Sequence, residues 1–143
     1  MKHYNIVLLP GDGIGPEITF IAQTLLEVTA KKAGFSLTFD EQLIGGAAID
    51  KKGEPLPLKT IEACKESDAI LLAAIGSPRF DSLDRNQRPE SGLLGLRASL
   101  DLFANIRPVK IRPSLISSST LKAEIIKEVD LIVVRELTGG IYF

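Results

Sequence analysis

Three arginines in the second half of the sequence have the side-chain chemistry to bind a small anion. They are Arg97, Arg107 and Arg135, and two of the three stand at the ends of apolar segments. An arginine that directly follows such a segment lies where the edge of a sheet opens, which is where α/β folds place their binding sites. A rigid guanidinium binds a carboxylate through two parallel hydrogen bonds, so the three would suit a dicarboxylate with a neighbouring hydroxyl. The alternative for each is a solvated surface arginine.

A second candidate is the glycine-rich turn 10–17, with the sequence PGDGIGPE, which lies between a predicted strand and a predicted helix. Backbone amides in such a turn, together with the amino end of a helix, can hold a phosphate. The turn departs from the Rossmann fingerprint G-x-G-x-x-G, because Pro16 stands in place of the third glycine. A plain tight turn is the simpler interpretation, and a ligand-facing loop is the alternative.

The remaining reactive side chains are isolated from one another in the sequence. Tyr142 follows Gly139 and Gly140, a turn that could present its phenol to a ligand, although a packed aromatic ring is the simpler interpretation. Cys64 is the single cysteine, and its apolar neighbours predict a buried core residue rather than a nucleophile. His, Cys and carboxylate residues do not cluster at the spacing of a metal site, so we expect no metal ligands in this chain.

Composition excludes several classes of protein. The 143 residues are 45% hydrophobic and 24% charged, enough to bury one ordinary globular core. With 17 basic and 18 acidic side chains, there is no global electrostatic case for binding nucleic acid or an anionic membrane. The longest apolar run, 69–75, is too short to span a bilayer, and the first residues do not resemble a signal peptide, so we expect a cytoplasmic protein.

Strands and helices alternate along the first half of the sequence. Apolar runs at 6–9 and 69–75 predict buried strands, and the alternation at 35–39 predicts a strand with one wet face. Helical spacing follows Gly15 and ends near Gly34, with short helical pieces around 45–57 and a full helix at 58–66. This order predicts an α/β fold with a largely parallel sheet.

The second half is less regular. Segment 76–92 has two prolines, many charges and almost no apolar residues, which predicts a long exposed loop. Beyond it we expect a helix at 93–102, a strand at 103–109, a helix at 121–128 entered through the run Ser117–Thr120, and a strand at 129–134. The last residues, 138–143, end in apolar and aromatic side chains without a closing helix or charged tail, so we expect a chain that is truncated relative to its full domain.

Read together, four ordered motifs resemble the β-decarboxylating dehydrogenases, the isocitrate/isopropylmalate dehydrogenase family. Their spacing is similar to that of the 3-isopropylmalate dehydrogenases over the whole chain. The motifs are LPGDGIGPE at 9–17, RPESGLLGLR at 88–97, LFANIRP at 102–108 and VRELTGGIYF at 134–143. The resemblance implies a two-domain, non-Rossmann α/β fold with a mostly parallel sheet, here truncated. It implies a first domain at 1–102 and, at 103–143, the start of a second domain for substrate binding and dimerisation.

The resemblance also implies roles for four residues in substrate chemistry. Arg97, Arg107 and Arg135 would bind the malate carboxylates and hydroxyl. Tyr142 would be the catalytic tyrosine that assists proton transfer at the decarboxylation stage. Family members supply metal-binding aspartates for Mg²⁺ or Mn²⁺ from positions beyond residue 143, so no metal ligand is expected in this chain.

Five further residues would line the cofactor and the substrate side chain. By the resemblance, Ile14, Gly76 and Glu90 match positions near the NAD cofactor. Leu93 and Leu94 are apolar, whereas isocitrate-specific relatives carry a polar side chain before the first arginine. An isopropyl group favours apolar contact, and an extra carboxylate there would have no partner, so this pair favours 3-isopropylmalate over isocitrate or homoisocitrate.

The implied activity is NAD-dependent oxidative decarboxylation of (2R,3S)-3-isopropylmalate to 4-methyl-2-oxopentanoate in leucine biosynthesis, by a cytoplasmic homodimer. Two alternatives stay open. The chain as it stands could be a non-catalytic fragment that at most binds an anion weakly. The complete enzyme could instead act on another 2-hydroxy dicarboxylate, such as isocitrate, homoisocitrate, tartrate or malate.

Overall fold

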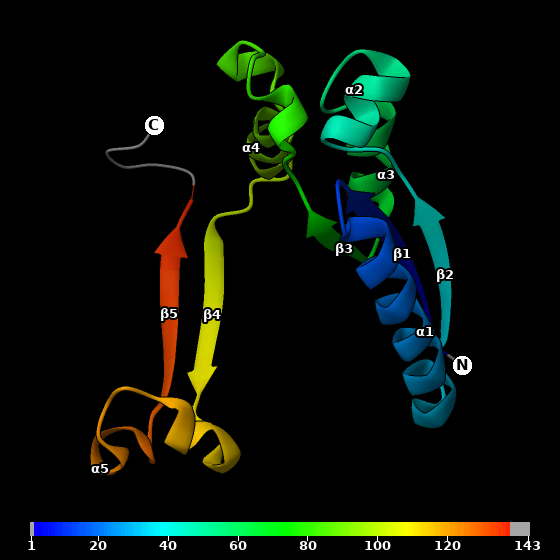
Figure 1. Cartoon of the computed structure of the whole chain (residues 1–143). Helices are drawn as coiled ribbons and strands as arrows, with labels where there is room; N and C mark the ends of the chain where they lie inside the picture. Colours follow the sequence, from blue (N-terminus) through cyan, green and yellow to red (C-terminus); the bar gives the residue numbers. More distant parts are fainter. Residues whose placement is uncertain (1, 138–143) are drawn as a thin grey trace. The chain divides into compact units, whose positions relative to one another are not determined.

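A computed structural model of the chain describes residues 2–137. The chain divides into two compact units between Leu100 and Asp101 (Figure 1). Each unit has its own sheet, with three strands in the first and two in the second. Within residues 2–137, no helix combines the length and the apolar character needed to cross a membrane.

The sheet of the first unit is parallel, with the strand order β2-β1-β3. The central strand pairs Ile6 with Phe39 on one side and Leu9 with Leu72 on the other. The strands are β1 (His3–Gly11), β2 (Ser36–Glu41) and β3 (Ala69–Ala74). The three strands predicted for this half of the sequence and their parallel arrangement are therefore confirmed.

Helices connect these strands on both faces of the sheet. The connecting helices are α1 (Gly15–Ala33), α2 (Gly46–Lys52) and α3 (Leu58–Glu66), and α4 (Pro89–Ser99) follows β3. The chain passes from β1 to β2 on one side of it, and then crosses over β1 to reach β3 on the other side. Because parallel crossovers are right-handed, α1 covers one face and α3 the other. The sequence predicted the bounds of α1, including its end at Gly34, whose φ of 76° closes the helix.

The core of the first unit lies on the side of the sheet that faces α3. Val7 and Leu9 point to that face from β1, and Cys64 of α3 and Leu96 of α4 pack with them and with Ile44. All five side chains are less than 5% exposed. The prediction of Cys64 as a core residue is confirmed.

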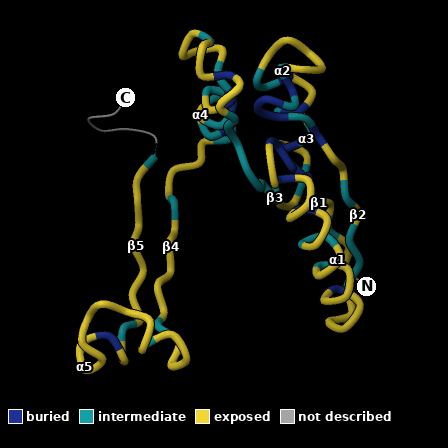
Figure 2. The backbone as a smooth tube through the Cα atoms, viewed as in Figure 1, coloured by how far each residue is buried: buried dark blue, intermediate teal, exposed yellow. Residues whose placement is uncertain are grey.

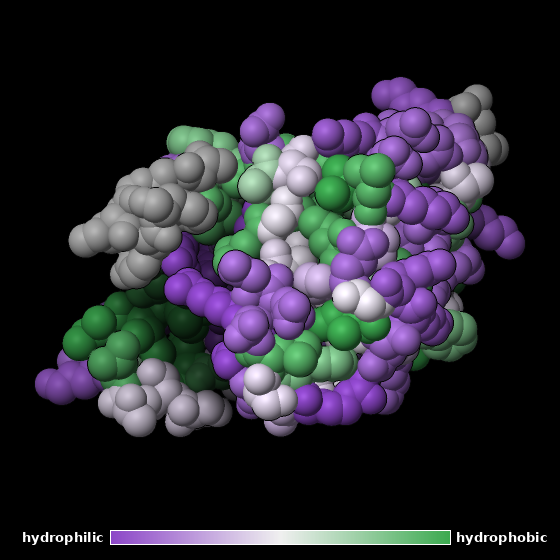
Figure 3. All heavy atoms as spheres, turned by 90° about the horizontal axis from the view of Figure 1, so that it is seen from above, coloured by the Kyte–Doolittle hydropathy of each residue, from purple (hydrophilic) through white to green (hydrophobic). Residues whose placement is uncertain are grey.

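Apolar side chains also reach the surface along α1, and Figure 3 shows hydrophobic residues between hydrophilic ones on one face of the molecule. A stripe at spacings of three and four residues is between 44% and 66% exposed: Ile14, Ile18, Ile21, Leu25 and Val28. The residues of α1 that face the sheet are on another side of the helix and include the buried Thr19 and Ala30. The periodicity thus located the helix, but its apolar residues extend beyond the buried face.

The predicted exposed loop at 76–92 is wrong in part. The segment contains two 3₁₀ turns, Pro78–Phe80 and Arg85–Gln87, and α4 begins inside it, at Pro89. Proline at the first helical position is favourable because its φ already suits a helix. Gly92 of α4 is buried, and a Cβ there would lie 2.5 Å from the carbonyl oxygen of Pro55, so this part of the helix packs closely on the α2–α3 connection.

The second unit is built on an antiparallel pair of strands, β4 (Ala104–Lys110) and β5 (Asp130–Glu136). Both strands were predicted. All of β5 and all of β4 except Asn105 are exposed (Figure 2). Among the described residues of this unit, Ile126 is the one buried hydrophobic side chain.

The connection from β4 to β5 differs from the predicted helix at 121–128. It contains a 3₁₀ turn, Pro113–Ser118, and a single helical turn, α5 (Ala123–Ile126). The serine run does not start the helix as expected. Instead the backbone N–H of Leu121 donates to the Ser119 hydroxyl at 3.1 Å, a local bond that competes with helix formation.

Candidate functional site

The carboxyl ends of β1 and β3 lie side by side. Gly11 pairs with Ala74, and the N–H of Asp12 donates to the Ala74 carbonyl at 2.8 Å. The chain leaves β1 toward β2 on one side, while β3 lies on the other, so this edge is the point where the strand order reverses. In open α/β sheets, ligands bind in the crevice outside the carboxyl ends of the strands at such a point. The glycine-rich turn and the segment after β3 therefore meet where a binding site is expected.

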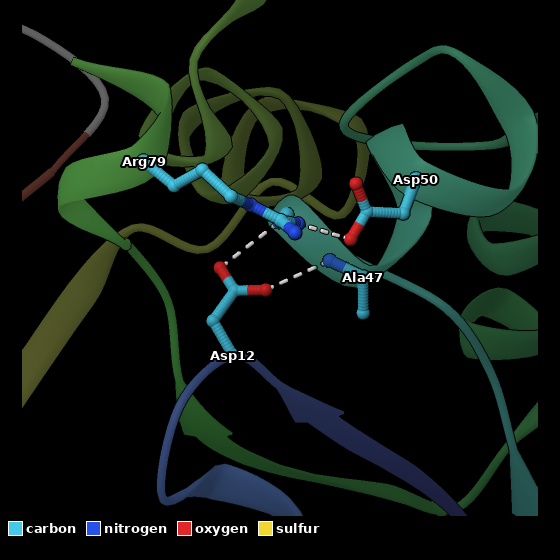
Figure 4. Close-up of polar contacts among 5 residues, drawn as sticks. Asp12, Ala47, Asp50 and Arg79 are labelled. Carbon is cyan, nitrogen blue, oxygen red and sulfur yellow. Dashed lines mark hydrogen bonds and ion pairs between the residues drawn. The ribbon is translucent and has the colours of Figure 1, made fainter.

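The Asp12 carboxylate joins three segments at this edge. Its Oδ2 accepts hydrogen bonds from the backbone N–H groups of Gly46 and Gly76, both at 2.9 Å, and its Oδ1 accepts one from Ala47 at 2.8 Å. Figure 4 shows the carboxylate pointing toward the start of α2, with a bond to Ala47 drawn. The side chain is buried, with Asp12 only 7% exposed. Sequence reasoning did not assign Asp12 any function.

Two glycines let α2 come this close to Asp12. A Cβ at Gly45 would lie 2.6 Å from Oδ2 of Asp12, and a Cβ at Gly46 would lie 2.3 Å from the ring of Phe80. Gly45 also has a φ of 70°, a conformation that side-chain-bearing residues rarely adopt. From the sequence, Gly45 and Gly46 were predicted only to mark the boundary of a short helical piece, yet a specific close approach requires each of them.

Gly76 and Glu90, both predicted near the cofactor, are brought together. Gly76 has a φ of 115°, and a Cβ there would lie 2.7 Å from Oε1 of Glu90. Glu90 is exposed, in the first turn of α4. Ile14, the third predicted cofactor residue, lies two positions after Asp12 at the start of α1 and is 60% exposed.

An open cavity of about 360 Å³ lies beside the turn. It is lined by residues 11–13 on one side and by Ser77 and Arg79 on the other. The Arg79 guanidinium forms an ion pair with Asp50 of α2 (Figure 4) and lies over the ring of Phe80, 4.6 Å from its centre. Both charged side chains are about half exposed or more, so the pair adds little to stability.

One side of α4 carries four of the predicted site residues. Glu90, Leu94 and Arg97 follow at spacings of four and three, and Leu93 falls on the same side of the helix. Leu93 and Arg97 are half-buried, and Leu94 is 47% exposed. The helix therefore aligns a carboxylate, an apolar pair and a guanidinium in one row.

The other two arginines share one face of the second unit. Asn105 and Arg107 are two residues apart on β4, and Arg135 is the register partner of Asn105, so all three side chains project to the same face. The Arg107 Nε donates to Oδ1 of Asn105 at 2.8 Å. Both arginines are exposed. Tyr142, the predicted catalytic tyrosine, lies outside the described residues.

Comparison with known proteins decides the family. Residues 5–143 match the family described as isocitrate/isopropylmalate dehydrogenase. The chain belongs to this family. It is 68% identical over its full length to the 3-isopropylmalate dehydrogenase of Synechococcus sp. (strain CC9605), and 60% identical over 142 residues to that of Trichormus variabilis. It spans 40% and 39% of the length of these two relatives.

Solved structures of the isocitrate/isopropylmalate dehydrogenase family share the fold. The chain superposes on isocitrate dehydrogenase from Methylococcus capsulatus with a TM-score of 0.72 and 30% identity, over 97% of this chain and 36% of that one. It superposes on a β-decarboxylating dehydrogenase from Thermococcus kodakarensis with a TM-score of 0.65 and 27% identity, over 93% and 33% of the two chains. The predicted family and the predicted α/β fold class are confirmed.

The described residues offer a fit for only one of the groups expected in this family. For a nucleotide cofactor there is an open turn at Gly13, where a Cβ would meet nothing within 4 Å, and a cavity that this turn lines. Gly76 also lies close to the Glu90 carboxylate. For a divalent metal, no group of three or more His, Cys, Asp or Glu residues is suitably arranged within residues 2–137. Cys64 adds no reactive group, because burial, and then the charge of Asp40, raise the pKa of its thiol.

Proposed function

We propose that this chain supplies the amino-terminal part of an enzyme that oxidises and decarboxylates (2R,3S)-3-isopropylmalate to 4-methyl-2-oxopentanoate with NAD, a step of leucine biosynthesis. The row on α4 carries the proposal. Glu90 lies against Gly76 at the edge of the sheet, and Arg97 lies seven residues further on, about 10 Å along the helix axis. That length suits a nicotinamide at one end and a small dicarboxylate at the other.

Each of the predicted site residues within the described part of the chain has a proposed role that follows from its chemistry. The Glu90 carboxylate accepts hydrogen bonds, as the hydroxyls of a ribose would require. Leu93 and Leu94 give apolar contact to the isopropyl group and would leave an additional carboxylate without a partner. Arg97, together with Arg107 and Arg135 of the second unit, would bind the carboxylates and the hydroxyl and hold C2 for hydride transfer.

Groups outside the described residues complete the proposal. Tyr142 would move a proton at the decarboxylation stage. When bound, NAD supplies the hydride acceptor, and Mg²⁺ or Mn²⁺, on ligands beyond residue 143, supplies a Lewis acid at the substrate oxygens. We also propose that the complete protein is a cytoplasmic homodimer, as the resemblance to the family implies.

A chimera tests the activity. Residues 1–143 replace the matching 143 residues of the Synechococcus relative, and NADH formation is followed with 3-isopropylmalate, isocitrate, homoisocitrate, malate or tartrate. We expect turnover with 3-isopropylmalate and a strong preference for it. A folded chimera that does not oxidise 3-isopropylmalate would overturn the proposal. Preference for another of these acids would show that the proposed substrate is wrong.

Leu93→Asn in the same chimera tests the side-chain contact. A polar group there should lower kcat/KM for 3-isopropylmalate and narrow its advantage over isocitrate by about tenfold, as expected for about 1.4 kcal/mol of lost discrimination. Leu58→Asn, at a leucine of α3 that is 66% exposed, is the matched control and should leave the preference unchanged. If the ratio of kcat/KM for 3-isopropylmalate to that for isocitrate is unchanged in Leu93→Asn, Leu93 does not contact the substrate side chain.

A second candidate function applies to the 143-residue chain by itself. It spans 40% of its Synechococcus relative, and β4 and β5 are exposed on both faces. A module of this kind would bind a dicarboxylate through its arginines without turnover. Calorimetric titration of the 143-residue chain with 3-isopropylmalate, beside an assay for NADH formation, separates the two functions.

A further inference from the structure

We propose that Asp12 is a positioning residue for the NAD cofactor. Its carboxylate fixes the turn after β1, the start of α2 and Gly76, two residues after the end of β3, relative to one another. In doing so it sets the position of Gly76 against Glu90, where the cofactor would bind. The inference rests on the proposed NAD-dependent function, and it assigns to Asp12 a role that acts through the backbone of Gly76.

The hydrogen bonds of Asp12 span long distances in the sequence. Its three donors are 34, 35 and 64 residues away, on two separate segments, and the carboxylate is buried among them. Bonds to an ionised acceptor are stronger than neutral ones, and a buried N–H that loses its acceptor is costly. The three segments are therefore held by one side chain.

Gly76 is the last link between Asp12 and the cofactor residues. Its N–H is the donor to Oδ2 of Asp12, and a Cβ at this position would lie 2.7 Å from Oε1 of Glu90, so that carboxylate would have to shift to make room for it. Its φ of 115° is a conformation open to glycine but rarely adopted by other residues. A change at Asp12 that frees this N–H would let the backbone at Gly76 relax and move away from Glu90.

Other contacts hold the same segment less firmly. The ion pair between Arg79 and Asp50 is largely exposed, and exposed pairs contribute little. Phe80 is buried against Gly46 and anchors the far end of the segment. Neither contact involves Gly76 itself, whose backbone N–H is bonded to Asp12.

Asp12→Asn is the informative substitution because it keeps the shape of the side chain. Asparagine offers one acceptor oxygen and one NH₂ donor. If its oxygen takes the place of Oδ2, the NH₂ faces the N–H of Ala47; if it takes the place of Oδ1, the NH₂ faces the N–H groups of Gly46 and Gly76. One of the contacts becomes donor against donor in either orientation.

The substitution is tested in the chimera, with steady-state kinetics in NAD and in 3-isopropylmalate. We expect the KM for NAD to rise about tenfold, with smaller changes in kcat and in the KM for 3-isopropylmalate. Hydrogen exchange of the peptide that contains Gly76, followed by mass spectrometry, should be faster. Asp68→Asn is the matched control, because Asp68 is an exposed aspartate of the same unit that accepts one backbone N–H, from Asn5 at 2.7 Å. Its kinetics and its exchange at Gly76 should match those of the parent.

The outcomes separate this inference from the proposed function. A parent chimera without NAD-dependent turnover overturns the proposed function. Hydrogen exchange at Gly76 then tests the positioning role alone, and equal exchange in the parent and in Asp12→Asn would reject it. An active parent in which Asp12→Asn keeps its KM for NAD, or changes both KM values and kcat together, overturns the inference. If Asp12→Asn does not fold, Gly76→Ala changes the other partner of the same hydrogen bond. A KM for NAD equal to that of the parent would then also reject the inference.

Discussion

The two units differ in how their strands are covered. In the first unit, β1 lies between two parallel neighbours, and its residues Val7, Leu8 and Leu9 are at most 2% exposed. In the second unit, β4 and β5 pair with each other, and Ile132, Val133 and Val134 are between 48% and 62% exposed. Parallel strands need cover on both faces, whereas a two-stranded antiparallel pair is only marginally stable by itself. Stability therefore resides in the first unit, and the second mainly presents side chains.

The largest expected effect is on the stability of the 143-residue chain. Leu9→Ala should lower the free energy of unfolding by about 3 kcal/mol, because it leaves a cavity in the core of the first unit. Leu131→Ala on β5 removes the same atoms from a side chain that is 46% exposed and should cost about 0.5 kcal/mol or less. Urea unfolding measures both. Equal losses would break the comparison, since they would show that β5 is covered in solution.

Activity, unlike stability, should depend strongly on an exposed residue of the second unit. In the chimera, Arg107→Ala should lower kcat/KM for 3-isopropylmalate about 30-fold, equivalent to about 2 kcal/mol, through loss of a charged hydrogen bond to a carboxylate. Its melting temperature should stay unchanged, because Arg107 is exposed and, within residues 2–137, its side chain bonds to its neighbour Asn105 alone. Lys110→Ala removes a cation from the opposite face of the same strand and is the control. An equal loss of activity at Lys110 would exclude a specific role for Arg107.

The close packing of α4 gives a smaller effect. Gly92→Ala should destabilise the 143-residue chain by about 1.5 kcal/mol, because the new Cβ would meet the rigid carbonyl of Pro55. Gly95→Ala, one helical turn away, meets only the end of the Leu56 side chain at 3.1 Å. There the gain in helix propensity should offset the contact, so thermal unfolding should hardly change. Equal effects would show that α4 packs more loosely than described.

The smallest expected effect is the response of the first unit to alkali. Burial, and then the charge of Asp40, raise the pKa of Cys64 in the folded chain above its ordinary value of 9.0. The unfolded thiol therefore ionises first, so this contribution to stability is present below pH 9.0 and is lost as the pH rises through the folded pKa. Unfolding free energies of the parent and of Cys64→Ala should converge in alkali by a few tenths of a kcal/mol. Parallel pH profiles would contradict the raised pKa.

Local patterns in the sequence determined most of the elements. Short apolar runs, and period-two alternation at 35–39, located the five strands of the described residues, and helical spacing located the long helix α1. The four motifs determined the family. They also led to the predicted site residues, and the roles of those residues remain predictions.

Only the tertiary structure decided how the segments meet. Asp12 looks like any turn residue until residues 46, 47 and 76 are brought to its carboxylate. The start of α4 at Pro89 was missed because this end of the helix is buried, and Gly92 there packs against the distant residue Pro55. Periodicity reports which face of an element is apolar, but a hydrogen bond or a close approach between residues far apart in sequence leaves no periodic trace. Such contacts exist only once the chain has folded, and they position the candidate site.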